Sequence, residues 1–87
     1  MMADKNEFLR LVEGQLNEMR TSIRALQKKL ENTQGPEKTD LALRLDSLEK
    51  RYRFGVERWQ DLSETSENVW DGLQDELEAF WHQLTTP

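Results

Sequence analysis

Large apolar side chains recur at alternating intervals of three and four residues along the first third of this chain. The positions that share this spacing are Leu9, Val12, Leu16, Met19, Ile23, Leu26 and Leu30. In an α-helix, such heptad spacing places every one of them on a single narrow stripe. Asp4, with Glu7 three residues later, has the pattern of a capping box at a helix start. The sequence therefore predicts a helix over about residues 4–32 with one apolar seam.

One segment interrupts the helical pattern. Gly35 and Pro36 favour a turn over residues 32–36, and Pro36 suits the first turn of a new helix. The heptad rhythm then resumes, with Gly55 as its one empty position. The apolar positions of this second run are Leu41, Leu45, Leu48, Tyr52, Trp59 and Leu62. Two helices joined by so short a turn pack as antiparallel neighbours. We therefore expect an all-α fold of a single domain, built on an antiparallel coiled-coil hairpin.

The two predicted helices differ in length. At 1.5 Å per residue, residues 3–31 form a helix of about 43 Å, whereas residues 37–84 form one of about 72 Å. Roughly from Glu64 onward, the longer helix has nothing opposite it in a simple hairpin. The second helix is therefore expected to extend beyond the first.

This extension carries an eleven-residue repeat. The motif Trp-x-x-Leu occurs three times, beginning at Trp59, Trp70 and Trp81, which are eleven residues apart. Eleven residues are close to three helical turns, so each repeat returns to nearly the same face. Val69, Leu77 and Phe80 widen the stripe. The candidate interaction site for an oligomer or a partner comprises Trp59, Leu62, Val69, Trp70, Leu73, Leu77, Phe80, Trp81 and Leu84.

Charge also divides the chain, and the division falls just before the first Trp-x-x-Leu motif. Residues 1–58 hold all twelve Lys and Arg with ten acids, whereas the remainder holds seven acids and His82. The net charge of −5 argues against nucleic acid as a partner, because phosphate binding needs a basic face. Acidic residues near a helix C-terminus interact unfavourably with the helix dipole, so the charges of the extension add little to its own helical stability.

Two arrangements would cover the apolar stripe of the extension. In the first, two hairpins pair and each stripe lies along the helices of the other copy, giving a helical-bundle homo-oligomer, either a dimer or a tetramer. In the second, the chain breaks near residues 63–68 and folds back as a third helix, with Ser63 or Ser66 as its cap. Neither Gly nor Pro lies in that segment. We therefore expect the long helix and the homo-oligomer.

The sequence contains no residue pattern that is typical of a catalytic site. There is no Gly-rich phosphate loop, no Cys and one His. Glu78 and His82 share a helical face, but di-iron bundles need two Glu-x-x-His units and two further Glu residues. We therefore expect no enzyme activity, no cofactor and no metal.

The compartment is expected to be the cytoplasm. No apolar run approaches the roughly 18 residues that span a bilayer. The first fifteen residues are too charged for a secretory signal, and the absence of Cys fits a reducing compartment. Binding to a lipid surface is the alternative, since amphipathic repeats with Trp suit an interface. The acidic polar face opposes it, because anionic lipids attract Lys and Arg.

The stretch from Leu48 to Leu84 resembles the second helix of small bacterial coiled-coil hairpin proteins. The similarity rests on Ser66-x-x-Val69-Trp70-Asp71-x-Leu73. The resemblance implies a cytoplasmic all-α hairpin without known catalysis, sometimes linked to stress, and it assigns no substrate. The sequence thus predicts a non-catalytic structural or interaction module that self-associates, with an unidentified protein as a further partner. A peripheral membrane protein remains the alternative.

Overall fold

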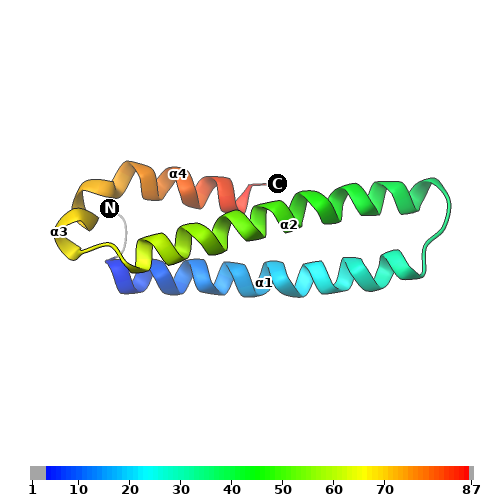
Figure 1. Ribbon diagram of the computed structural model, residues 1–87, viewed down its shortest axis with the longest axis horizontal. Coiled ribbons are helices and arrows are strands. Elements are labelled where there is room, and N and C mark those ends of the chain that lie inside the picture. The colour runs from blue at the N-terminus through cyan, green and yellow to red at the C-terminus, as the bar shows by residue number, and fades with distance from the viewer. Residues whose placement is uncertain (1–3, 87) are drawn as a thin grey trace.

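The computed structural model describes residues 4–86, and this part of the chain consists of helices and the turns between them. The elements in chain order are α1 (Lys5–Glu31), α2 (Pro36–Ser63), α3 (Glu67–Trp70), the 3-10 helix η1 (Asp71–Leu73) and α4 (Gln74–Thr85). The all-α class is confirmed. The elements form an elongated bundle with Cα extents of 53 × 19 × 18 Å (Figure 1).

The first two helices begin where the sequence supplies the right end groups. The carboxylate of Asp4 accepts a hydrogen bond of 2.9 Å from the backbone N–H of Glu7, which caps α1. Gly35 precedes α2 with φ of 76°, a backbone conformation that costs a glycine little, and Pro36 occupies the first turn. Across this turn, α1 and α2 lie side by side and run in opposite directions (Figure 1).

The favoured prediction of one long helix over residues 37–84 is wrong, and the alternative, a break near residues 63–68 followed by a helix that folds back, is the arrangement that the structure shows. Helix α2 ends at Ser63, the chain reverses over residues 64–73, and α4 returns along the α1–α2 pair (Figure 1). The reversal lets the chain cover its own apolar stripe. Folding back costs the closure of one short loop, whereas burial against a second copy costs the translational and rotational freedom of a whole molecule.

At the start of the reversal, where residues 63–68 contain neither Gly nor Pro, side chains bond to the local backbone. The Ser63 hydroxyl donates to the carbonyl of Gln60 at 2.7 Å, and the Thr65 hydroxyl donates to that of Asp61 at 3.1 Å. Such bonds compete with helix continuation, which explains why Ser and Thr favour helix ends. The ammonium group of Lys5 donates to the Thr65 carbonyl at 2.6 Å and so ties the reversal to the start of α1.

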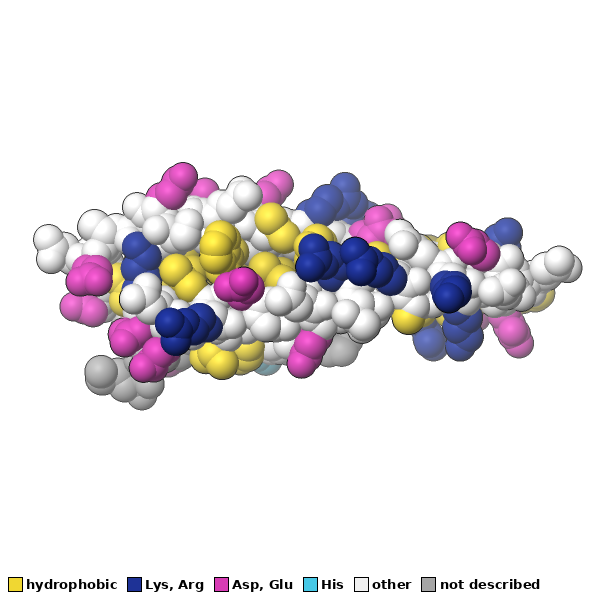
Figure 2. All heavy atoms as spheres, turned by 90° about the horizontal axis from the view of Figure 1, so that it is seen from below, with side chains coloured by type: hydrophobic (Ala, Val, Ile, Leu, Met, Phe, Trp, Pro, Cys, Tyr) yellow, Lys and Arg dark blue, Asp and Glu magenta, His cyan; other side chains and the backbone are white. Residues whose placement is uncertain are grey.

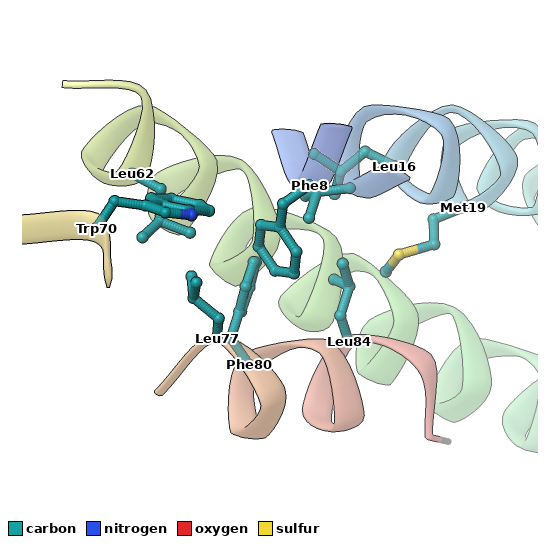
Figure 3. Packing of buried hydrophobic residues seen from close by; sticks show 9 residues of the cluster. Phe8, Leu16, Met19, Leu62, Trp70, Leu77, Phe80 and Leu84 are labelled. Carbon is teal, nitrogen blue, oxygen red and sulfur yellow. The ribbon is translucent and has the colours of Figure 1, made fainter. Parts of the chain in front are cut away.

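The hydrophobic core lies where three helices meet. Side chains from α1, α2 and α4 point toward one another, and Trp70 of α3 closes the cluster at its end (Figure 3). The buried members are Phe8, Val12, Leu16, Met19, Leu62, Trp70, Leu77, Phe80 and Leu84. Phe8 is central to this core and fully buried.

Helix α4 covers only one half of the α1–α2 pair. It has 12 residues against 27 in α1 and 28 in α2, and it ends where the Arg51 guanidinium donates to the Thr86 carbonyl at 2.9 Å. We call the two-helix part, residues 20–53, the tip. The three-helix part, residues 4–19 and 54–86, is the base.

Candidate functional site

The structure gathers the nine predicted interaction residues at the base, and most of them face their own chain. Five are buried: Leu62, Trp70, Leu77, Phe80 and Leu84. Trp59, Leu73 and Trp81 are half-buried and pack against the same core. Val69 alone points outward, with 54% of its surface exposed. In this conformation, the stripe is a core rather than a free surface.

Aromatic contacts show how tightly the stripe is held. The ring of Phe8 lies edge-on to that of Trp70, with centroids 5.6 Å apart, and 6.4 Å from that of Trp81. The indole N–H of Trp59 donates to the Leu9 carbonyl at 3.0 Å, which joins α2 to α1. These contacts orient the Trp side chains toward the helices of the same chain, and Trp70 is buried by them.

Two aromatic residues that pack here were missed by the sequence analysis. Phe8 lies one position outside the heptad stripe, although its spacing of four from Val12 places both on one helical face. Phe54 lies outside the predicted seam as well, yet its ring packs against Phe80 with centroids 5.6 Å apart. A third helix widens the buried face of each neighbour, and this widening brings in both Phe residues.

Gly55, predicted as an empty seam position, lies where three helices pack closely together. A β-carbon at Gly55 would lie 2.7 Å from Leu16 Cδ2 and 2.7 Å from Leu84 Cδ1. The missing side chain of α2 therefore makes room for Leu side chains from both α1 and α4.

The tip is the part of the pair that no third helix covers. Its seam residues Ile23, Leu41 and Leu45 are buried, but Leu26, Leu30 and Leu48 remain half-buried. Leu43 on α2 has 65% of its surface exposed, the highest value among the exposed large apolar side chains. An open groove runs between α1 and α2 here, lined by Arg20, Ile23, Gln27, Glu49, Tyr52 and Arg53.

Charge separates the tip from the base. The tip holds nine Lys or Arg and five Asp or Glu, whereas the base holds three and twelve. Figure 2 shows Lys and Arg gathered toward the tip on the face that α1 presents, with acidic side chains more frequent at the opposite end. Between residues 4 and 86 the single ion pair joins Lys50 and Asp46 at 3.0 Å, and both side chains are largely exposed. Most charges are therefore free to meet a partner.

Two further kinds of feature were sought in the described part of the chain, a metal-ligand cluster and a membrane-spanning helix. Among residues 4–86, no three His, Asp or Glu side chains gather closely enough to hold a metal ion. Within the same residues, no helix combines the length and the apolar content that crossing a bilayer requires.

Comparison with protein-family models, with curated proteins and with solved structures finds no match to this chain. The resemblance to small coiled-coil hairpin proteins therefore stays a prediction. What the structure defines is a small all-α bundle with a two-helix tip.

Proposed function

We propose that this protein is a non-catalytic interaction module that self-associates, and that the tip is the surface through which two copies meet. The observation that carries this proposal is the partial cover of the α1–α2 pair, since α4 ends beside Arg51 and leaves a two-helix segment beyond it. Two helices alone bury only one face each, and apolar side chains such as Leu26 and Leu48 stay partly exposed to solvent.

Charge favours a second copy of this chain as the occupant. A two-fold antiparallel pairing lays the basic tip of each copy along the acidic base of the other. The same contact is then made twice. Opposite net charges steer such an encounter and suppress the parallel arrangement, in which like charges would meet.

Lipid binding gains no comparable support. The Trp and Leu side chains that would enter a bilayer surface are those that the base buries, including Trp70 and Leu84. Self-association through the tip needs no rearrangement of this core. The proposed role is therefore that of an assembly or adaptor element, and a heterologous partner with an acidic helical surface would use the same face.

Sedimentation equilibrium of the purified chain from micromolar to millimolar concentration tests the proposal. We expect a reversible monomer–dimer equilibrium that weakens as NaCl is added, because salt screens the attraction between tip and base. The variant Leu43→Asp should shift the equilibrium toward monomer. Its matched control, Ala42→Asp, places the same charge at the neighbouring exposed position, about 100° around the helix and on another face, and should shift it far less. Dimerisation of Leu43→Asp as strong as that of the parent chain would show that the tip is not the surface.

A further inference from the structure

We propose a second mode of pairing, in which two copies exchange α4. In each copy residues 36–85 become one continuous helix, and its C-terminal part packs against the base of the other copy. This inference goes beyond the proposed function, because it uses the base and requires no contact at the tip. A different observation carries it.

That observation is the eleven-residue repeat, which the folded-back structure does not require. Once the chain reverses, α2 and α4 are separate helices, and their apolar faces need not share a register. Leu62 of α2, Leu73 of η1 and Leu84 of α4 nevertheless keep their interval of eleven across the reversal. In a continuous helix, this interval holds all three on one face. The repeat is thus the pattern of a helix that runs through the break.

The backbone at the reversal is close to helical already. Glu64 has φ of −88° and ψ of −8°, and α3 and η1 are short helical turns. Ser66 is extended, with ψ of 154°, and its side chain makes no capping hydrogen bond. Within residues 4–86 a positive φ occurs at Gly35 alone. No residue of the reversal therefore has to leave a left-handed conformation when the helix becomes continuous. Rotation at Ser66, with a smaller change at Leu73, which has φ of −101° and ψ of 11°, brings these residues into helical conformation.

Exchange conserves the contacts that hold α4. Leu84 would meet Gly55 and Leu16 of the second copy as it now meets those of its own chain, which is the general basis of domain swapping. The folded-back state also carries a local cost. The indole N–H of Trp70 is buried at the reversal without a hydrogen-bond partner. Straightening the chain removes this constraint on Trp70.

The exchanged dimer differs from the tip-paired dimer in shape and in its response to salt. Because each α4 enters the other copy from its base, the two bases meet end to end and the tips point apart. The particle is then close to twice the 53 Å length of one copy. In this dimer the segments around residues 64–67 of the two copies lie close to the two-fold axis, so that Glu64 and Glu67 of one copy approach those of the other. Salt screens their repulsion and should therefore strengthen this dimer, whereas it weakens pairing at the tip.

A proline at position 66 separates the two states. The φ of −69° at Ser66 suits proline, and its N–H makes no backbone hydrogen bond in the folded-back structure. Inside a continuous helix, proline would remove a hydrogen bond and clash with the preceding turn. This cost should lower the population of the straightened chain by about 10²-fold for each copy. Ser66→Ala is the matched control, since alanine favours the helix.

The experiment measures both variants by sedimentation velocity and small-angle X-ray scattering at high NaCl, in the Leu43→Asp background that silences the tip. Thermal melting of each variant establishes that it folds. We expect an elongated dimer for Ser66→Ala that disappears in Ser66→Pro. A dimer that persists unchanged in folded Ser66→Pro, or no elongated dimer in folded Ser66→Ala, overturns the exchange. Neither result bears on the tip, because Leu43→Asp has removed that contact, so the two proposals fail separately.

Discussion

The Cδ1 atom of Leu84 occupies the space that a side chain on Gly55 would need, with 2.7 Å between it and the position of the missing β-carbon. This contact joins the end of α4 to the middle of α2, and Leu16 of α1 meets the same point from the other side. A single glycine therefore decides how closely the third helix approaches the other two.

Enlarging Gly55 should displace α4. We expect Gly55→Leu to lower the free energy of unfolding by about 1–3 kcal/mol through overpacking, measured by urea denaturation. Leucine is a much better helix former than glycine, so a loss reports the crowding and not helix propensity. Gly14→Ala is the control, because nothing lies within 4 Å of its added carbon, and it should stabilise the protein by about 0.5–1 kcal/mol. Equal stabilisation by both changes would mean that Leu84 does not pack there.

Truncating Phe8 should remove the centre of the three-helix core. Phe8 is fully buried and contacts the rings of Trp70, Phe80 and Trp81. We expect Phe8→Ala to cost about 3–5 kcal/mol of unfolding free energy. Leu11→Ala, three residues on at a position with 53% exposure, should stay within about 0.5 kcal/mol of the parent chain. A mild effect at Phe8 would contradict the position of α4 against α1.

Trp70 should tolerate phenylalanine much better than alanine. Trp70→Ala leaves a cavity beside Phe8 and should cost about 3–5 kcal/mol. Trp70→Phe keeps much of the ring and deletes the buried N–H that has no partner. Chemical denaturation of both variants, followed by the remaining Trp fluorescence, measures the difference. Similar losses in the two would indicate that the N–H of Trp70 does find a partner in solution.

Lys5 should stabilise the reversal through its bond to the Thr65 carbonyl. We expect Lys5→Met to lower the free energy of unfolding by about 1 kcal/mol, since methionine keeps the apolar stem and loses the donor. Amide hydrogen exchange should also rise around residues 64–67. The control, Lys38→Met, removes an exposed ammonium group at the start of α2 and should change neither measurement. Unchanged exchange at the reversal in Lys5→Met would show that this bond is not formed.

Several elements of the fold could be predicted from spacing and end groups alone. The heptad stripe from Val12 to Ile23 is buried, and the turn before Pro36 follows from the left-handed conformation that Gly35 accepts. These features depend on residues close together in the chain, and so local chemistry is sufficient to specify them.

The sequence offered the reversal after Ser63 as one of two arrangements, but it could not decide between them in the same way. The segment around Thr65 is weakly helical but compatible with a helix, and the eleven-residue repeat continues through it. The outcome depends on whether the free energy gained by burying Trp70, Leu77 and Leu84 against the same chain exceeds the cost of interrupting the helix. That comparison involves contacts between residues far apart in the chain, such as Lys5 with Thr65 and Phe8 with Trp81.

By itself, the sequence determined that this chain is helical, where its first turn lies, and that an apolar stripe with three Trp residues must be covered. Only the tertiary structure decided what covers the stripe. The chain covers it with its own first two helices, because one short loop closes at a smaller entropic cost than the capture of a second molecule. The same decision gave Phe8 and Gly55 their places in the core and left the tip, with Leu43, as the uncovered part of the bundle.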